Sequence, residues 1–193
     1  YITDGSDLGI IHEVFVTEQY KLPVEAKNFK LIFDFGANVG YTAIYFNIIS
    51  PKAKIIAVEA LPQTITKLQK NVTCIKNIEI FPAAISDKNG QVTFYDYPKS
   101  SMSSSLLKRH PQAKSFSVDS VTMDSLIKKY GIPDLIKVDI EGSEYSVFKN
   151  SSILQDIPLI IGEVHPRMGG FSEKDFIELF SNFTVTKNHN NQD

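Results

Sequence analysis

The sequence is short of several features that would each assign it to a class of proteins. It has one cysteine, Cys74, so it can form no intrachain disulfide, and this favours a reducing compartment. A formal net charge of -2 provides no basic field for nucleic acid. No apolar run approaches the roughly 18 residues of a membrane span, and the start lacks a secretion signal. We therefore expect a cytoplasmic protein with no nucleic-acid partner and no membrane span.

What is present is a globular composition. The 193 residues are 42% hydrophobic, which is enough for one domain with a sizeable core. Predicted helices alternate with predicted strands, which are Lys30–Asp34, Lys54–Glu59, Ile78–Phe81, Asp134–Ile140 and Ile157–Val164. This alternation predicts an α/β fold with a doubly wound, mostly parallel, Rossmann-like sheet. We expect residues 1–29 to form an N-terminal arm or cap and residues 30–193 to form the domain.

Local signals predict the remaining elements. Periodic apolar residues and end signals indicate helices over Gly40–Ile49, Pro62–Val72 and Thr122–Tyr130, and Ser172 with Asp175 resembles a capping box for a later helix. Gln91–Asp96 is predicted to be a strand in a hairpin-like extension. The most loop-like segment is Tyr97–Ser117, and Asn182–Lys187 is the candidate for a last strand.

The most informative segment is Leu31–Phe46, LIFDFGANVGYTAIYF, where an apolar run meets an acid and glycines before a helical pattern. Dinucleotide sites use G-x-G-x-x-G, because backbone N–H groups must approach a pyrophosphate. Here the middle glycine is missing, and Asp34 stands at the strand end, where a carboxylate would repel a pyrophosphate. An acid suits a ligand with positive charge, such as the ammonium and sulfonium of S-adenosylmethionine, while the glycines still allow a tight turn.

Acids stand at the ends of four predicted strands, and those ends share one edge of the sheet. They are Asp34, Glu59, Asp139 with Glu141, and Glu163 with His165. Unpaired acids near a core are costly, so packing alone does not explain the set. Glu59 follows the glycine turn at the distance where dinucleotide and S-adenosylmethionine proteins carry a carboxylate for the ribose hydroxyls.

Five segments, taken in order, resemble the FkbM methyltransferases, a family of class I S-adenosylmethionine-dependent enzymes. They are DFGANVGYTA (34–43), VEA (58–60), FPAAISDKNGQVTF (81–94), DSLIKKYGIPDLIKVDIEGSEYSVFK (124–149) and GEVHP (162–166). They cover most of the chain from residue 30 onward, and LIKVDIEGSE is the most specific. The resemblance implies the class I methyltransferase fold, and O-methylation of a hydroxyl on a sugar, a glycan or a small natural product.

The resemblance also implies a role for each matching position. The methionine portion of S-adenosylmethionine would lie against the glycine turn, at Asp34, Gly36, Ala37, Asn38, Gly40, Tyr41 and Thr42. The ribose would bind Glu59 beside Ala60. The adenine would lie near Ala84, Ser86 and Asp87, and the transferred methyl group near Asp139.

Two places depart from the family pattern. The family usually has proline directly after the acid of the second strand, whereas here Ala60 and Leu61 precede Pro62, so the loop near the ribose is expected to differ in shape. The tail after Phe183 is short and polar, and the last edge strand of the class I fold is not evident in it.

Methyl transfer to a hydroxyl needs a group that takes the proton. His165 is the first candidate, because imidazole titrates near neutrality, and Asp139 and Glu141 are its rivals. A second interpretation makes Asp139, Glu163 and His165 the ligands of a divalent metal ion that acidifies the acceptor.

Two other functional classes stay open at this point. An NAD-dependent oxidoreductase could use Tyr145 and Lys149, which have the Tyr-x-x-x-Lys spacing of short-chain dehydrogenases. The missing G-x-G-x-x-G and the acid at Asp34 count against it. A non-catalytic cofactor-binding domain is the third class, and the acids at four strand ends argue against it. Neither the acceptor nor the oligomeric state is encoded in a recognisable motif.

Overall fold

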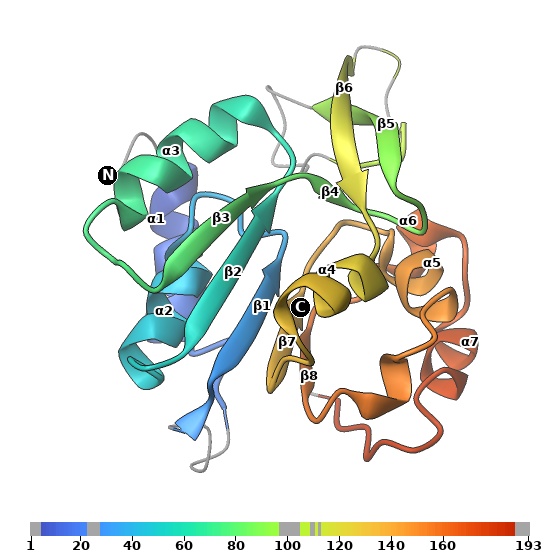
Figure 1. The fold of residues 1–193 in the computed structure, drawn as a ribbon. Coiled ribbons are helices and arrows are strands. Elements are labelled where there is room, and N and C mark those ends of the chain that lie inside the picture. The colour runs from blue at the N-terminus through green and yellow to red at the C-terminus, as the bar shows by residue number, and fades with distance from the viewer. Residues whose placement is uncertain (1–4, 23–27, 97–104, 109–110, 112, 188–193) are drawn as a thin grey trace.

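The central sheet has five strands, all of them parallel. The computed structural model describes residues 5–22, 28–96, 105–108, 111 and 113–187. The strand order is β3-β2-β1-β7-β8 (Figure 1), and each pair is parallel. The strands are β1 (Leu31–Phe35), β2 (Lys54–Glu59), β3 (Ile78–Pro82), β7 (Leu135–Val138) and β8 (Ile160–Gly162). The predicted mostly parallel α/β sheet is therefore confirmed.

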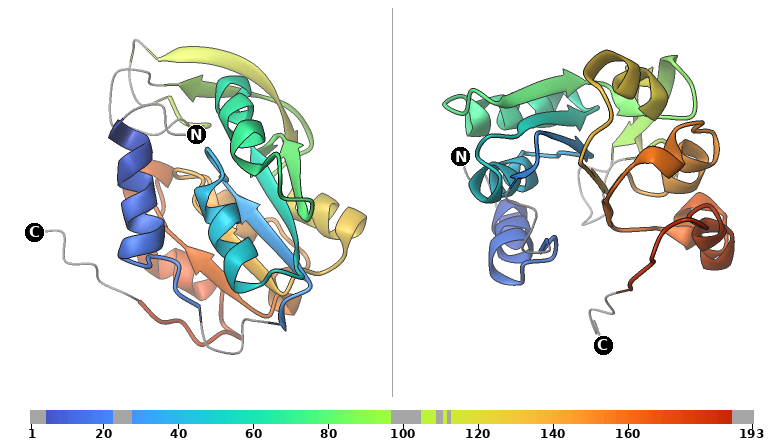
Figure 2. Two further views of the ribbon diagram at one scale, coloured as in Figure 1. Left: turned by 90° about the vertical axis from the view of Figure 1, so that its left-hand side faces the viewer. Right: turned by 60° about the horizontal axis from the view of Figure 1, so that its bottom comes forward.

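Helices cover both faces of this sheet, as Figure 2 shows from two further directions. One face carries α1 (Gly5–Ile11), the π-helix η1 (His12–Val16), α2 (Tyr41–Ile49) and α3 (Pro62–Val72). The other carries α4 (Met123–Tyr130), α5 (Glu144–Lys149), the short η3 (Leu154–Asp156), α6 (Pro166–Gly169) and α7 (Glu173–Glu178). The predicted capping box begins α7, where Ser172 and Asp175 exchange side-chain and backbone hydrogen bonds.

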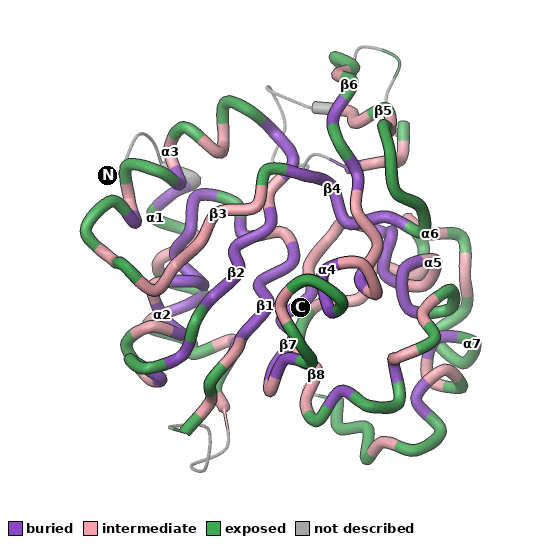
Figure 3. The backbone as a smooth tube through the Cα atoms, viewed as in Figure 1, coloured by how far each residue is buried: buried purple, intermediate pink, exposed green. Residues whose placement is uncertain are grey.

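Alternation along the strands supplies two separate apolar layers, since successive side chains point to opposite faces. Phe33 and Phe35 of β1 pack under α4, α5 and α7. Ile32, between them, packs with α2 and α3 in the second layer. Figure 3 shows the resulting buried track along the central strands. Val14 and Tyr20 from the N-terminal arm join the second layer, and the division into residues 1–29 and 30–193 stays a prediction.

A second, smaller sheet stands beside the first. It contains β4 (Ala84–Ile85), β5 (Gly90–Asp96) and β6 (Lys114–Val121) in the order β4-β6-β5. The predicted strand Gln91–Asp96 is part of β5, which pairs antiparallel with β6. β6 overlaps the predicted loop Tyr97–Ser117, so that loop is too long at its C-terminal end. Residues 97–104, 109–110 and 112 of this loop lie outside the described residues.

Two sequence predictions near the C-terminus are corrected. β8 has three residues instead of the expected Ile157–Val164, because Leu154–Asp156 turns as a 3₁₀ helix and Ile157 bonds back to Leu154. Asn182–Lys187 forms a turn and irregular chain rather than a strand. Its aromatic Phe183 packs on Phe180 of the helical side. Along the described stretches of chain, no helix has the length and apolar character needed to cross a membrane.

Candidate active site

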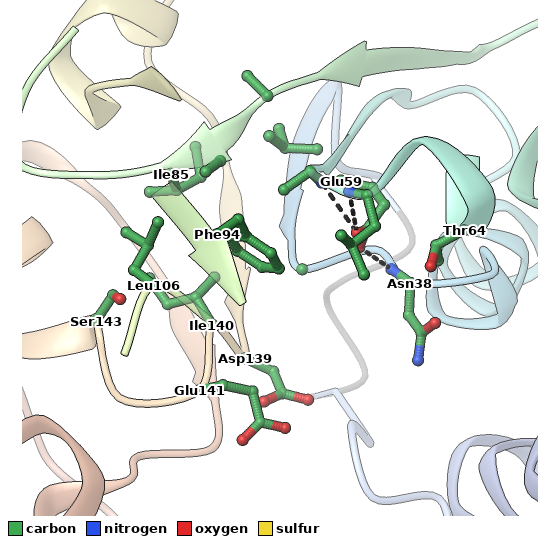
Figure 4. Close-up of a pocket in the computed structure, with 16 residues that line it drawn as sticks. Asn38, Glu59, Thr64, Ile85, Phe94, Leu106, Asp139, Ile140, Glu141 and Ser143 are labelled. Atoms are coloured by element: carbon green, nitrogen blue, oxygen red, sulfur yellow. Dashed lines mark hydrogen bonds between the residues drawn. The ribbon is translucent and has the colours of Figure 1, made fainter. Parts of the chain in front are cut away.

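A cavity lies at the carboxyl ends of the central strands (Figure 4). One part of its wall comes from the turn after β1, the end of β2 and the loop after β7, and the other part from β4, β5 and Leu106. The lining residues are Gly36, Asn38, Val58, Glu59, Ala60, Leu61, Thr64, Ala83, Ala84, Ile85, Phe94, Leu106, Asp139, Ile140, Glu141 and Ser143. Sheets of this kind bind ligands at this edge, so the cavity is the candidate active site.

The predicted cofactor residues divide into two groups around this cavity. Those that line it are Gly36, Asn38, Glu59, Ala60, Ala84 and Asp139. Those that do not line it are Asp34, Ala37, Gly40, Tyr41, Thr42, Ser86 and Asp87. Within the second group, the Ser86 hydroxyl donates to Asp87 at 3.1 Å, and Ala37, Tyr41 and Thr42 are buried. Their roles in binding a cofactor stay predictions.

The glycine turn after β1 is shaped by close backbone packing. The N–H groups of Gly36 and Ala37 both donate to the carbonyl of Val58, at 3.1 and 2.9 Å. Gly36 has a φ of 75°, and a Cβ there would lie 1.9 Å from the backbone oxygen of Asp139. The turn is therefore held against β2 on one side and against the end of β7 on the other.

Glu59 uses its carboxylate to hold its own loop. One oxygen accepts from the backbone N–H of Asn38 at 3.0 Å, and the other accepts from Ala60 and Leu61, each at 2.9 Å. Burial raises the pKa of Glu59, and these three hydrogen bonds oppose the rise. A proline in place of Ala60, as the family pattern has it, would lack the N–H that Ala60 donates to this carboxylate.

Asp34 is sealed inside the sheet instead of facing the cavity. It is completely buried, and one oxygen lies 3.2 Å from the ammonium of Lys137, which is also buried. Lys137 donates to the carbonyl of Gly36 at 2.9 Å, and its ammonium lies 5.5 Å from the centre of the Tyr20 ring. Burial lowers the pKa of Lys137, but the charges of Asp34 and Asp139 outweigh it and raise the pKa. Lys137 therefore stays a cation beneath the glycine turn.

A cluster of acids surrounds the imidazole of His165, which does not itself line the cavity but lies close to the wall residues Asp139 and Glu141. Nδ1 of His165 donates to Oε1 of Glu144 at 3.0 Å. Nε2 lies 3.8 Å from a carboxylate oxygen of Glu163 and 4.0 Å from one of Glu141. Glu163 also accepts a hydrogen bond from the side-chain amide of Gln19 in the N-terminal arm. The structure thus brings the predicted catalytic residues His165, Asp139 and Glu141 together.

The charges around His165 decide its protonation. Burial lowers its pKa, but the hydrogen bond to Glu144 and the negative charges of Glu144, Asp139 and Glu141 raise it to about 9. The imidazole is therefore mostly protonated at pH 7, which differs from the neutral group that a free imidazole would provide. Burial raises the pKa of nearby Tyr20, and the charges of Asp139 and Glu163 raise it further, so this phenol stays protonated.

The same cluster could hold a cation. Asp139, Glu141 and His165 can each offer one ligand atom, and these atoms lie within 4.8 Å of one another. The sequence-based set was Asp139, Glu163 and His165, so Glu141 takes the place of Glu163 in this geometry. Two carboxylates and an imidazole are competent ligands for a divalent ion.

The residue pair expected of an oxidoreductase is placed elsewhere. The ring of Tyr145 stacks on Phe171, and the ammonium of Lys149 lies 5.3 Å from the centre of the Tyr145 ring. Neither residue lines the cavity. This arrangement gives no support to a Tyr-Lys catalytic pair at the sheet edge.

Sequence reasoning missed several residues of the site. Lys137 was signalled only by a lone cation in the apolar strand LIKV. Glu144 had the appearance of an ordinary acid in the first turn of a helix. Phe94 and Leu106 reach the cavity from the smaller sheet and the chain beside it, and no motif indicated that contact.

The profile of the Methyltransferase FkbM domain family matches residues 34–191. This chain belongs to that family. Its FkbM domain is 27% identical over 161 residues to the hexuronic acid methyltransferase AglP of Haloferax volcanii, with 81% of this chain and 64% of AglP covered. It is 26% identical over 134 residues to the 2-O-methyltransferase NoeI of Sinorhizobium fredii, with 61% and 55% covered. The chain therefore spans less than two thirds of the length of either relative.

A solved structure supports the fold of this FkbM domain. The fibrillarin pre-rRNA processing protein of Methanococcus jannaschii matches with a TM-score of 0.50 and 14% identity, over 82% of this chain and 56% of that one. At that identity the likeness shows the fold alone. The class I methyltransferase fold implied by the sequence is thereby confirmed.

Proposed function

We propose that this FkbM domain transfers the methyl group of S-adenosylmethionine to a hydroxyl of a sugar, a glycan or a small natural product. The observation that carries the proposal is a single cavity whose wall holds both the glycine turn after β1 and the acids Asp139 and Glu141 after β7. Family membership supports the reaction class, and the names of AglP and NoeI support a sugar-type acceptor.

The residues present fit S-adenosylmethionine at its charged end. That end carries an ammonium and a sulfonium, and the cavity wall offers the carboxylates of Asp139 and Glu141. Oδ1 of Asp139 is buried and accepts no hydrogen bond from any residue that the structure describes. Such an oxygen is costly unless a ligand satisfies it.

The rest of the wall fits the nucleoside. Asn38 and Glu59 provide polar groups near the end of β2, while Phe94 and Leu106 provide apolar surface for a flat base. Mixed linings of this kind bury a ligand while a few polar groups fix its orientation.

When bound, S-adenosylmethionine supplies a methyl group already activated by the sulfonium. The chain itself orients the reacting groups, which contributes up to about 7–11 kcal/mol in favourable systems. Proton removal from the acceptor hydroxyl adds typically 10²–10⁴-fold. His165 performs that step in our proposal, with Asp139 and Glu141 beside it. Its pKa of about 9 makes the neutral imidazole the minor form at pH 7, so transfer accelerates as the pH rises.

Calorimetric titration with S-adenosylmethionine and with NAD tests the cofactor. We expect saturable binding of S-adenosylmethionine, weakened by Asp139→Asn, and no binding of NAD. Asp119→Asn is the matched control, because Asp119 is an exposed acid on β6 that bonds to Gln91. Saturable NAD binding without a response to S-adenosylmethionine would reject the proposal in favour of an oxidoreductase.

A labelled-methyl assay against a panel of sugars, hexuronic acids and polyols tests the acceptor. We expect label on a hydroxyl oxygen, and a loss of 10²–10⁴-fold in kcat for His165→Gln. Label found only on carboxylates would contradict the hydroxyl assignment while leaving methyl transfer intact.

A divalent metal ion at Asp139, Glu141 or Glu163 with His165 stays a prediction. Treating the protein with a chelator separates the two activation schemes. If His165 takes the proton, the rate of transfer is unchanged; a loss that added Mg²⁺ or Mn²⁺ restores assigns the activation to a metal ion.

We also propose that the enzyme works in the cytoplasm without a nucleic-acid partner. The single cysteine and the small net charge support both statements. Cell fractionation and a nucleic-acid binding assay test them separately.

A further inference from the structure

We propose that Glu144 is a positioning residue, which fixes the imidazole of His165 with Nε2 toward the acid cluster. This inference rests on the proposed function, in which His165 takes a proton from the acceptor. Glu144 does not line the cavity, so it would act through His165 and not on the substrate.

Glu144 is buried deep in the protein. Its exposed fraction is 0%, although glutamate is almost never fully buried unless it is paired. Oε1 accepts from the N–H groups of Gly142 at 3.0 Å and Ile140 at 3.3 Å, and from Nδ1 of His165 at 3.0 Å. One oxygen therefore joins the loop after β7 to the loop after β8.

The loop after β7, which Glu144 holds, makes a tight turn. Glu141 has a φ of 55° and Gly142 a φ of 99°, both in the left-handed region. A Cβ on Gly142 would lie 3.1 Å from the backbone nitrogen of Gly169 and 3.1 Å from Cβ of Met168. The tight turn thus fits directly against α6, whose N-terminal neighbour is His165. The hydrogen bond of Glu144 spans the same contact.

Charged groups from several elements of the described chain face His165. The loop after β7 brings Asp139 and Glu141, the loop after β8 brings Glu163, and α5 brings Glu144. Arg167 and Glu173 line a shallow hollow next to the imidazole. Of Glu144, Glu163 and Glu141, only Glu144, at 3.0 Å, lies within hydrogen-bond distance of a ring nitrogen, since the other two lie at 3.8 and 4.0 Å.

The chemical consequence follows from the two ring nitrogens. A carboxylate that accepts from Nδ1–H leaves Nε2 as the site that can accept a proton. The same carboxylate then stabilises the imidazolium that forms, as in a Ser-His-Asp triad. The proton of the acceptor hydroxyl would move to Nε2, and its electron pair would remain on the oxygen that forms the new bond to the methyl carbon.

The test is Glu144→Gln, which keeps an oxygen acceptor for Gly142 and His165 but removes the charge. The ¹⁵N signals of His165, assigned with His165→Gln, are titrated in both proteins by NMR. We expect Glu144→Gln to weaken the preference of neutral His165 for the Nδ1–H tautomer, because an amide can donate as well as accept. We expect kcat for methyl transfer to fall 10- to 100-fold when both proteins are compared at a pH where the imidazole is neutral. The KM for S-adenosylmethionine should change less than twofold. Glu178→Gln, an exposed charge on α7, is the control for loss of one negative charge.

The wild-type protein provides a measurement that does not depend on the folding of a variant. Above its pKa, His165 should carry its proton on Nδ1, and the ¹⁵N shifts report this directly. An Nε2–H tautomer overturns the proposal, and so does an unchanged tautomer balance or unchanged kcat in folded Glu144→Gln. These NMR readouts need no S-adenosylmethionine, so failure of the proposed function, seen as absent cofactor binding, is recorded separately.

Discussion

Asp34 and Asp139 lie at neighbouring strand ends of one sheet, yet their surroundings differ. Asp34 is fully buried against the ammonium of Lys137, 3.2 Å away. Asp139 is half-buried in the cavity wall, close to Glu141 and the imidazole of His165. The position of an acid at a strand end therefore does not by itself identify a group that meets a ligand. What separates the two is whether the chain provides its own cation at contact distance.

The Asp34–Lys137 pair and the acid cluster around His165 are therefore two regions with different expected roles. The Asp34–Lys137 pair links β1 to β7 and holds the carbonyl of Gly36. The cluster around His165 contains more acids than cations at close range, which raises the pKa of His165 to about 9. We therefore expect changes at the pair to affect mainly stability, and changes in the cluster to affect mainly the pH dependence and rate.

The largest loss of unfolding free energy is expected from Lys137→Met, which leaves the carboxylate of Asp34 buried without its cation. Breaking such a pair costs roughly 3–5 kcal/mol of unfolding free energy, measured by urea denaturation. The double variant Asp34→Asn/Lys137→Met should recover a large part of that loss. A loss below about 1 kcal/mol for Lys137→Met would contradict the structural role.

The next largest effect is a pH-dependent contribution of His165 to the free energy of unfolding. Its folded pKa of about 9 lies above the unfolded value near 6.5, so the charged form stabilises the folded state. This contribution is fully present below about pH 6.5 and is lost as the pH rises through 9. The stability difference between wild type and His165→Gln should therefore shrink by up to about 3 kcal/mol between pH 6 and pH 9.5. A difference that stays constant over this range would show that His165 is not held protonated.

A smaller loss of unfolding free energy is expected from a substitution at Gly36, which accepts a hydrogen bond from Lys137 and lies against the backbone of Asp139. In Gly36→Ala the new methyl group would meet the backbone oxygen of Asp139, and overpacking of this kind costs roughly 1–3 kcal/mol. Because the turn and Asp139 would be pushed apart, calorimetry should also show weaker binding of S-adenosylmethionine. Gly131→Ala has a similar positive φ but open space around its Cβ, so it serves as the control for backbone conformation alone. Equal losses in both variants would argue against the close contact.

The smallest change in stability is expected from Glu163→Gln. The Glu163 side chain is 44% exposed, and exposed substitutions usually alter stability by less than about 0.5 kcal/mol. Removing its charge should lower the pKa of His165, measured by NMR titration, because one of the nearby acids is lost. A stability loss comparable to that of Lys137→Met would remove the distinction between the two regions.

The sequence was sufficient to predict the parallel sheet and the edge of that sheet which carries the candidate site. The apolar runs and the glycine turn predicted β1, β2, β3 and β7, and the acids that follow them predicted a cluster at one edge. It was not sufficient for β6, whose alternating polar residues resemble a loop. Asn182–Lys187 failed in the opposite way, because Phe183 packs on Phe180 while Val185 stays exposed, so its apolar alternation does not form a buried face.

The pairing of charges could not be predicted at all from local patterns. Lys137 meets Asp34 across a hundred positions of chain, and Glu144 meets His165 across two loops. Both contacts depend on which strands become neighbours, a property of the tertiary fold. The same limit explains why the ion pair of Asp34 was not foreseen: the strand end was located correctly, but its partner on β7 was not visible.

The cavity has walls of two different origins. The parallel sheet supplies one wall through tightly packed turns, while β4, β5 and Leu106 supply the other from a separate small sheet. Substitutions at Phe94 or Leu106 can therefore alter the outline of the cavity without disturbing the ion pair or the acid cluster. For engineering, this makes the small sheet the place to adjust the fit of the proposed nucleoside, with the parallel sheet left as a constant scaffold.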